Sequence, residues 1–165
     1  MEQLWAPWRM QYIQSAIKNK SDEGCIFCTK SQASEDEKNF IIMRDKTCFA
    51  MMNLFPYNSG HLMVAPYKHT GELDDLTETE LADLMVLTRR CKRLLTTVIK
   101  PEAFNIGINL GRVAGAGIAD HVHIHIVPRW NGDTNFMPVI GETKVIPEAL
   151  EPLYQRLKAA VANLD

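Results

Sequence analysis

Three histidines alternate with apolar residues in the run HVHIHIV at 121–127. Successive side chains of a β-strand point to opposite faces, so His121, His123 and His125 would share one face of a strand. Valine and isoleucine would occupy the other face, which can pack on a core. Three adjacent imidazoles in a core would need many internal hydrogen-bond partners. We therefore expect the histidine face to meet water, a ligand or a metal ion.

The histidine run has three interpretations. The first is a solvent-facing strand with chance histidines, although three at alternate positions, among five in the chain, fit chance poorly. The second is a catalytic metal site, because histidines two residues apart on a strand can chelate zinc. The third is nucleophilic catalysis, in which a neutral imidazole attacks phosphorus while an acceptor at its second ring nitrogen fixes the tautomer.

A glycine-rich segment, GRVAGAG at 111–117, lies a few residues before the histidine run. Glycines let backbone N–H groups turn toward an anion and approach it closely. Taken alone, the segment is also compatible with an ordinary turn. Beside a nucleophilic imidazole, an anion-binding loop favours phosphate chemistry.

Two cysteines, Cys25 and Cys28, have the C-x-x-C spacing of half a zinc site. The alternatives are a redox pair, which the lack of a following βαβ pattern disfavours, or two cysteines without a special role. A zinc site would need two more ligands. Cys48 and Cys91 fall in an expected strand and an apolar helical stripe, so we expect both in the core. His69 and the first histidine of the run remain as candidates.

Short strands are expected to hold the histidines and their neighbouring loops in place. Apolar runs predict strands at 40–43, 48–52 and 61–65, and turn-forming residues predict a loop at 53–60. Residues 104–110 alternate between apolar and polar or glycine positions, which predicts a half-buried strand.

Two helices are expected beside these strands. Thr77 and Glu80 have capping-box spacing at the start of a long helix, and Pro101 marks its end. A last helix is expected to begin near Pro147. Strands around one central helix indicate an antiparallel α+β sheet rather than βαβ units. The apolar stripe of the long helix comprises Leu81, Leu84, Met85, Thr88, Cys91, Leu95 and Val98, and that of the last helix comprises Leu150, Leu153, Tyr154, Leu157, Ala160 and Val161.

The N-terminal part of the chain predicts an arm followed by a polar loop. Residues 21–39 are polar and are expected to form a loop that contains the cysteine pair. The residues before them carry aromatic side chains that we expect to dock on this domain or on a second subunit: Trp5, Trp8 and Tyr12, with Pro7 between them. No repeat or linker interrupts the sequence, which predicts one domain over 1–165. Its expected parts are the arm and cysteine knuckle (1–39), the catalytic core (40–130) and a C-terminal loop and helix (131–165).

Composition excludes several classes of protein. The chain has 165 residues, of which 46% are hydrophobic and 23% charged, with 18 basic and 20 acidic side chains. This composition is typical of one globular domain, and the near-neutral balance disfavours binding to nucleic acid. No run of about eighteen apolar residues predicts a membrane span, and the N-terminus lacks the pattern of a signal peptide. Four cysteines are too few for a disulfide scaffold, so we expect a cytoplasmic protein with reduced thiols.

The sequence resembles the histidine triad (HIT) family, whose signature is His-φ-His-φ-His-φ-φ with φ apolar. The run at 121–127 fits this signature, and GHLMVAP at 60–66, with Asn53 before it, resembles the family's upstream strand. WAPWRM at 5–10 and HIVPRW at 125–130 resemble the branch that contains diadenosine tetraphosphate phosphorylases and related HIT hydrolases. The resemblance covers nearly the whole chain. It implies a HIT-like antiparallel sheet with a central helix and a C-terminal helix.

The resemblance implies an enzyme that forms a covalent nucleotidyl-histidine intermediate. His123 would attack the α-phosphorus of a nucleoside polyphosphate or phosphoramidate, and the backbone carbonyl of His121 would orient its ring. His125 and His61 would lie close to the phosphate. Adenine dinucleotides would be the substrates, with water, phosphate or a sugar phosphate as acceptor. A nucleoside phosphoramidate hydrolase and a purine-nucleotide-binding regulator with little turnover are the alternatives.

The resemblance also implies nucleotide contacts. Asn53 would bind ribose and Asn109 the phosphate, while Phe49 and Leu54 are candidates for an adenine pocket. Gly115, Ala116 and Gly117 would line the α-phosphate. Many family members carry Gln and Ser just before the triad, where this chain has Gly117 and Ile118, so backbone donors must contribute more to leaving-group stabilisation.

Zinc-bearing relatives, including galactose-1-phosphate uridylyltransferases, imply a ligand set of Cys25, Cys28, His69 and His121. A site with four protein ligands is structural rather than catalytic. It is compatible with a nucleophilic His123, whereas a three-histidine catalytic metal would need His121 twice. The resemblance further implies a homodimer formed through the central helix and a neighbouring strand.

Overall fold

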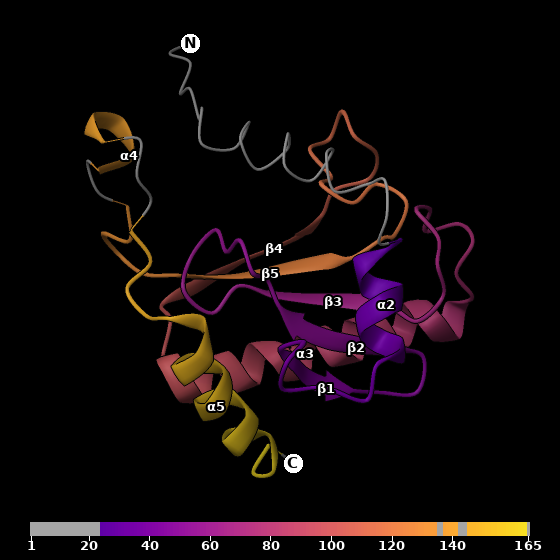
Figure 1. The fold of residues 1–165 in the computed structure, drawn as a ribbon, viewed down its shortest axis with the longest axis horizontal. Coiled ribbons are helices and arrows are strands. Elements are labelled where there is room, and N and C mark those ends of the chain that lie inside the picture. The colour runs from indigo at the N-terminus through magenta and orange to yellow at the C-terminus, as the bar shows by residue number, and fades with distance from the viewer. Residues whose placement is uncertain (1–23, 135–136, 142–144, 165) are drawn as a thin grey trace.

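The structure is built on one antiparallel sheet with the strand order β1-β2-β3-β5-β4 (Figure 1). This computed structural model describes residues 24–134, 137–141 and 145–164, so the expected N-terminal aromatic arm lies outside the described residues. The sheet and its helices confirm the predicted α+β class. The strands are β1 (Ile41–Arg44), β2 (Cys48–Met52), β3 (Leu62–Pro66), β4 (Ala103–Ile108) and β5 (Ile124–Arg129).

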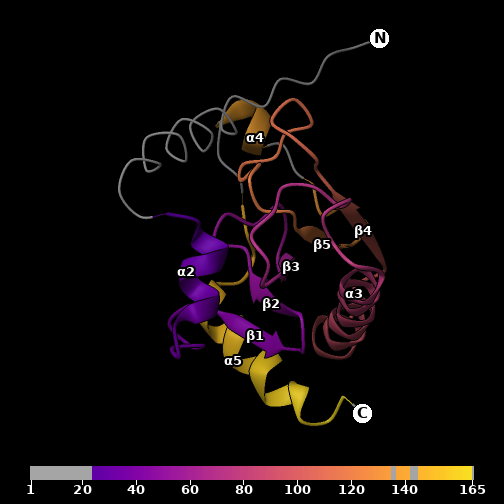
Figure 2. The ribbon, with the colours of Figure 1, turned by 90° about the vertical axis from the view of Figure 1, so that its right-hand side faces the viewer.

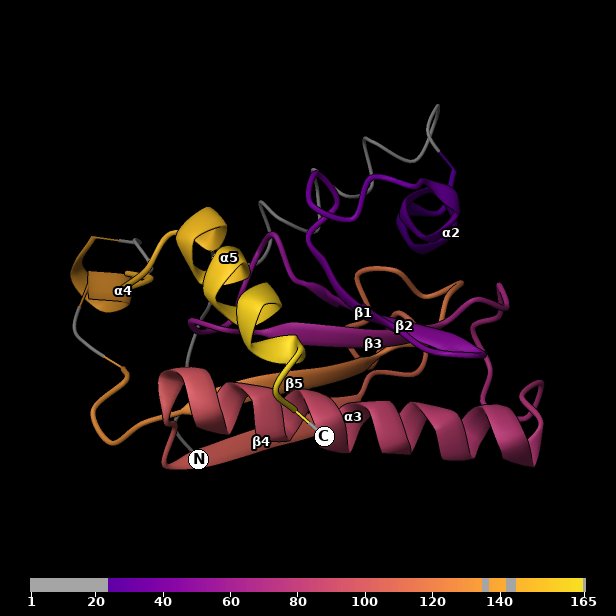
Figure 3. The ribbon, with the colours of Figure 1, turned by 90° about the horizontal axis from the view of Figure 1, so that it is seen from below.

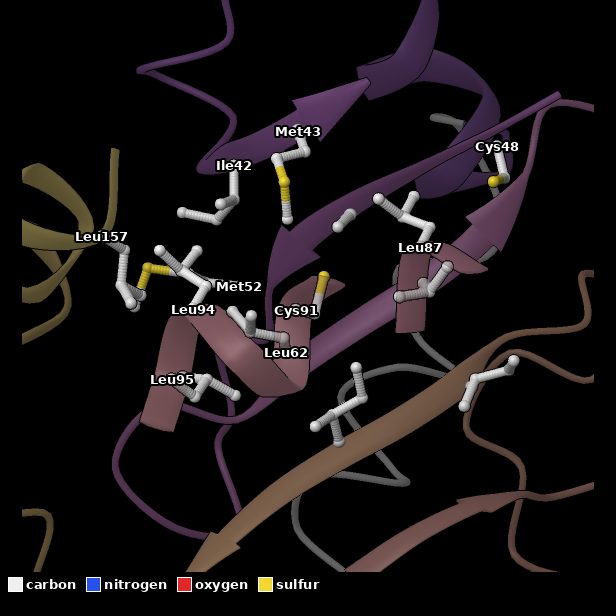
Figure 4. Close-up of a cluster of buried hydrophobic side chains, with 14 of the residues drawn as sticks. Ile42, Met43, Cys48, Met52, Leu62, Leu87, Cys91, Leu94, Leu95 and Leu157 are labelled. Carbon is white, nitrogen blue, oxygen red and sulfur yellow. The ribbon is translucent and has the colours of Figure 1, made fainter. Parts of the chain in front are cut away.

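The helix α3 (Glu78–Ile99) lies along one face of the sheet, and α5 (Leu150–Val161) packs beside it (Figure 3). The predicted capping box is present, because the Thr77 side chain accepts a hydrogen bond from the Glu80 backbone and the Glu80 carboxylate accepts one from the Thr77 backbone. Lys100 adopts a left-handed conformation directly after the helix, ahead of Pro101. Leucines of α3 and α5 meet Ile42, Met52 and Leu62 of the sheet in the main core (Figure 4).

The short helix α2 (Ile26–Gln32) covers the opposite face of the sheet (Figure 2). The loop expected at 21–39 is therefore wrong for residues 26–32. Seven residues are too few for a stable helix in isolation, and burial of Phe27 in a second apolar cluster with Ile41, Phe49 and Met63 supplies the missing stabilisation. Because α2 and α3 cover opposite faces, every residue of β2 and β3 is buried. A further short helix, α4 (Met137–Ile140), was not predicted either.

The histidine strand begins later than predicted. Its paired residues start at Ile124, which lies opposite Val64 of β3 and Ile108 of β4, so His121 and His123 precede β5. The backbone N–H of Val122 donates instead to the carbonyl oxygen of Thr70 at 2.7 Å. The predicted alternation of faces still holds over this segment. Val122 lies in the main core, whereas the rings of His121 and His123 contact Phe27 on the other side.

Two predicted core positions are also corrected. Met85 was assigned to the buried stripe of α3 but is 60% exposed, while Leu87 and Leu94 are fully buried in its place. Apolar residues of α3 fit more than one stripe at i, i+3 and i+4 spacing. The sequence alone therefore does not show which stripe faces the sheet. The strand predicted to be half-buried is also mostly exposed, with Ile106 of the edge strand β4 at 46%.

The last helix starts at Leu150, three residues after the predicted Pro147, and it buries the predicted Leu153, Tyr154 and Leu157. Cys48 and Cys91 lie in the core, as predicted. Within the described ranges, no helix has the length and apolar character needed to cross a bilayer.

The turn before β3 depends on a glycine. Gly60 has a φ of +76°, and a Cβ atom there would lie 2.6 Å from Ile99 and 3.3 Å from Pro128. The left-handed backbone favours glycine, and a Cβ atom would also have to displace the end of the Ile99 side chain. The turn therefore packs directly on the end of α3 and on β5, and it sets where His61 enters the sheet.

We expect Gly60→Ala to be more destabilising than Gly132→Ala. Both positions have nearly the same φ, +76° and +74°, but nothing lies within 4 Å of a Cβ at Gly132. Each variant should lose about 1 kcal/mol of unfolding free energy to backbone strain, and Gly60→Ala about 1–3 kcal/mol more through overpacking. Urea unfolding of the two variants measures the difference. Equal losses would contradict close packing of this turn.

Candidate active site

Three histidines in or just before the neighbouring strands β3 and β5 form a connected group on the α2 side of the sheet. His61 precedes β3, and His125 lies on β5 opposite Met63. The Nε2 atom of His61 is 2.9 Å from Nδ1 of His125, and the His123 and His125 ring centroids are 4.7 Å apart. Although 64 residues separate His61 from His125 in the sequence, strand pairing brings them into hydrogen-bond contact.

His123 is held in one tautomer by the backbone of His121. Its Nδ1 atom lies 2.8 Å from the carbonyl oxygen of His121, and since a carbonyl can only accept, Nδ1 carries the proton. The lone pair is therefore on Nε2. Burial lowers the pKa of His123 below its usual value of 6.5, against an opposing effect of the bond to His121. A neutral ring with an unprotonated Nε2 is the form of histidine that acts as a nucleophile.

The same reasoning assigns the protons of His61 and His125. The backbone N–H of Tyr57 donates to Nδ1 of His61 at 3.0 Å, so a neutral His61 carries its proton on Nε2. That proton is donated to Nδ1 of His125, which places the proton of a neutral His125 on its own Nε2. The Tyr57 ring stacks on His61 with the centroids 4.9 Å apart. With these assignments, Nε2 of His123 has a lone pair and Nε2 of the neighbouring His125 carries a proton.

The loop at 53–60 is fixed by side chains that the sequence analysis missed. The Asn58 side chain donates to the Pro128 carbonyl and to Asp133, and Asp133 also forms a two-point ion pair with Arg129. The hydrogen bonds from Arg129 lower the pKa of Asp133 to about 2, so the carboxylate stays charged at neutral pH. The Asn-Ser-Gly turn at 58–60 was the available signal in the sequence.

Four side chains form a compact metal-binding cluster next to the histidine group. The candidate donor atoms of Cys25, Cys28, His69 and His121 all lie within 4.8 Å of one another. The Cys25 sulfur is 3.2 Å from Nδ1 of His121, the Cys28 sulfur is 3.4 Å from Nδ1 of His69, and the two Nδ1 atoms are 3.3 Å apart. The structure thus brings together the four residues predicted as zinc ligands.

The cluster has the dimensions of a tetrahedral zinc site. Zinc bonds of about 2.0–2.1 Å to nitrogen and about 2.3 Å to sulfur give a tetrahedron with edges of about 3.3–3.8 Å. Four of the donor separations, 3.2–3.6 Å, fall within or close to that range, and all pairs lie within 4.8 Å. His121 donates from Nε2 to the Pro66 carbonyl at 2.9 Å, so the Nδ1 lone pair faces the sulfurs. His121 is therefore oriented to bind a metal ion through Nδ1.

Cys25 differs in acidity from the other three thiols. Burial opposes ionisation of Cys25, but its contact with the His121 ring and hydrogen bonds from the backbone outweigh burial and lower its pKa to about 6. Burial and the neighbouring Cys25 raise the pKa of Cys28. Burial raises the pKa of both Cys48 and Cys91 to about 12. A thiolate is the form that binds metal, and Cys25 is the thiol that ionises most readily.

The predicted nucleotide-binding residues lie in three places. Asn53 lies beside the histidines, with its amide nitrogen 3.4 Å from Nδ1 of His61, and Leu54 next to it is 40% exposed. Asn109 follows the end of β4, and residues 111–117 form a loop closed by a hydrogen bond from Gly115 to Arg112. Phe49, in contrast, has no exposed surface because Phe27 and Tyr67 pack against its ring.

A second residue that the sequence analysis missed is Phe27. It lies between the two cysteines of the cluster, and its ring contacts both His121 and His123. The only signal in the sequence was an aromatic residue between the two cysteines of the C-x-x-C motif. No local sequence pattern shows which residues such a side chain contacts.

Comparison with known proteins agrees with the histidine geometry. The family model described as "HIT domain" matches residues 34–132. The chain belongs to the HIT family. It is 44% identical over 154 residues to "AP-4-A phosphorylase" of Mycobacterium tuberculosis, covering 91% of this chain and 79% of that protein. It is 39% identical over 93 residues to the asymmetrical bis(5'-nucleosyl)-tetraphosphatase of Schizosaccharomyces pombe, covering 56% of this chain and 50% of that protein.

A solved HIT structure has the same fold. The zinc-bound histidine triad family protein from Mycobacterium smegmatis superposes with a TM-score of 0.68 at 28% identity, covering 86% of this chain and 96% of that one. The predicted family and the predicted HIT-like fold are both confirmed.

Proposed function

We propose that this HIT protein is an enzyme that transfers the nucleotidyl group of dinucleoside polyphosphates through a covalent bond to His123. The observation that carries the proposal is the hydrogen bond from Nδ1 of His123 to the carbonyl of His121, which leaves a lone pair on Nε2. Burial, which lowers the pKa of this ring, keeps the lone pair available at neutral pH.

The reaction has two steps, and both are displacements at the same phosphorus atom. In the first, Nε2 of His123 bonds to the α-phosphorus of diadenosine tetraphosphate, the bond from that phosphorus to the bridging oxygen breaks, and ATP leaves. In the second, an acceptor oxygen attacks the same phosphorus and the bond to His123 breaks. Phosphate as acceptor yields ADP, and water yields AMP. Splitting one displacement into two lowers each barrier.

The positions of the imidazole protons suggest roles for the neighbouring histidines. His125, with its proton on Nε2, would donate to a phosphoryl oxygen or to the leaving oxygen, and His61 would keep it in that tautomer. Asn53 would bind ribose, Asn109 and the loop at 115–117 would contact the phosphate, and the exposed side chain of Leu54 would contact the base. Phe49 would reach a base only if Phe27 or Tyr67 moved, so we assign it a supporting role beneath the pocket.

The acceptor that we propose is inorganic phosphate. The support is the 44% identity to a protein named AP-4-A phosphorylase over 91% of this chain. Hydrolysis has weaker support, from the match to the tetraphosphatase over 56% of the chain. A phosphoramidate hydrolase or a nucleotide-binding regulator would use the same pocket, so product analysis must separate these functions.

Product analysis with diadenosine tetraphosphate tests the function. We expect ADP and ATP in the presence of phosphate, as resolved by ion-exchange chromatography. His123→Asn should lower turnover to about a thousandth or less, while nucleotide binding stays within about tenfold, because a nucleophile acts mainly in the transition state. AMP and ATP in the presence of phosphate would assign a hydrolase instead. Turnover retained by His123→Asn would refute the nucleophile.

We also propose that the metal of the cluster is zinc and that it is structural. Two thiols and two imidazoles are the ligands that zinc prefers, and four protein ligands leave no open position for a substrate. The ion would link the start of α2 to the loop that carries His69 and to the segment before β5. The zinc-bound state of the HIT protein from Mycobacterium smegmatis supports this choice of metal.

Zinc analysis tests the metal proposal. We expect about one zinc per chain by atomic emission, lost in Cys28→Ala and retained in the control Cys91→Ala, whose thiol lies in the core. At free zinc one hundredfold above the dissociation constant, the ion should add about 2.7 kcal/mol to the unfolding free energy of the wild type. Zinc retained by Cys28→Ala, or unfolding unaffected by a chelator, would contradict a structural site.

A homodimer built on the β4 edge completes the proposal. Among the described residues, no strand pairs with the outer edge of β4. Ile106 and Ile108 are exposed along it, and Met85 and Val86 are exposed on α3. Pairing two copies along β4 would extend the sheet and remove these apolar side chains from water.

Light scattering tests the dimer. The expected mass is about 37 kDa, twice the 18.7 kDa of one chain. Ile106→Glu should shift the equilibrium toward the monomer because it places charge at the proposed contact. Val113→Glu is the control, since Val113 is fully exposed in the loop that follows β4. A monomeric wild type, or equal effects of the two variants, would contradict the proposed interface.

A further inference from the structure

Phe27 is the side chain through which the metal-binding turn reaches the active site. It lies in the first turn of α2, between Cys25, the residue that precedes the helix, and Cys28. Its ring centroid is 4.9 Å from that of His123 and 5.0 Å from that of His121, with interplanar angles of 40° and 44°. These distances are those of direct aromatic contact.

The nucleophilic ring needs such a contact because its hydrogen bond does not fix it fully. The bond to the His121 carbonyl fixes Nδ1 of His123, but the ring can still tilt about the line from Cβ to Nδ1. Nε2 lies off that line, so a tilt moves the attacking atom. A rigid group packed against the ring restricts this tilt, and Phe27 is packed in that position.

Phe27 is itself immobilised from several sides. It has no exposed surface and packs among Ile41, Phe49 and Met63. Its backbone is fixed within the turn, where the N–H of Thr29 donates to the carbonyl of Cys25 at 2.9 Å. Both cysteines that flank Phe27 belong to the metal-binding cluster, so a bound ion would fix the ends of the turn that carries it.

We propose that Phe27 is a positioning residue, which packs against the imidazole of His123 and keeps Nε2 in line with the α-phosphorus. This role rests on the proposed nucleophilic function of His123. It predicts an effect on the chemical step and none on nucleotide affinity, because misalignment of an attacking atom slows the reaction without removing a ligand contact.

The test compares Phe27→Leu with Ile41→Val. Both remove a similar volume from the same buried cluster, so they should cost similar stability, but Ile41 has no ring in contact with His123. We expect Phe27→Leu to lower kcat about tenfold with KM unchanged, and Ile41→Val to keep both values within about twofold. Cobalt(II) bound in place of zinc should give the same visible spectrum in Phe27→Leu as in the wild type, which would show an intact metal site.

A second readout is independent of turnover. Long-range proton–nitrogen NMR of the uniformly ¹⁵N-labelled protein distinguishes the two tautomers of each histidine. In the wild type, His123 should give one set of signals with the proton on Nδ1. Phe27→Leu should broaden or double the His123 signals and leave those of His61 and His125 unchanged.

Unchanged kcat together with unchanged His123 signals in Phe27→Leu would overturn the proposal. A raised KM with unchanged kcat would also overturn it, because Phe27 would then be a nucleotide-binding residue. Failure of the proposed function is distinguishable, since it would appear as full activity of His123→Asn. The NMR comparison would still report whether Phe27 restrains the ring.

Discussion

The site depends on the hydrogen bond between Nδ1 of His123 and the backbone carbonyl of His121. This contact fixes which nitrogen of His123 carries the proton. A shift of the His121 backbone would therefore disturb the ring of His123. His121 uses its remaining groups elsewhere: its ring faces the metal-binding cluster through Nδ1 and binds the Pro66 carbonyl through Nε2. One residue therefore joins the metal-binding cluster to His123, through its side chain on one side and its backbone on the other.

The sheet makes this arrangement possible because its central strands are covered on both faces. The α3 face forms the main core, while the α2 face carries the histidines and a smaller apolar cluster. Burial on the second face excludes water from His123, which lowers its pKa and keeps it neutral. A metal ion bound at the start of α2 would stabilise a helix that is too short to form alone. The metal-binding cluster and the buried surroundings of His123 thus both depend on the same short helix.

Much of the site could be predicted because its signals are local. Alternation with period two placed the three histidines, and the spacing of Cys25 and Cys28 indicated the metal cluster. The features that were missed depend on contacts distant in sequence. The seven residues of α2 form a helix because Phe27 is buried, and the segment before β5 leaves the sheet because Val122 bonds to Thr70. Met85 was misplaced because overlapping helical stripes do not show which face meets the sheet.

The most direct test is identification of the covalent intermediate. The wild type is mixed with diadenosine tetraphosphate in the absence of phosphate, quenched in alkali, where a phosphorus–nitrogen bond survives, digested, and examined by mass spectrometry. The account predicts an adenylyl group on the peptide that contains the triad, with fragmentation assigning it to the ring of His123. Adenylation of another residue, or product formation with no enzyme-bound nucleotide at any time during the first turnover, would contradict it.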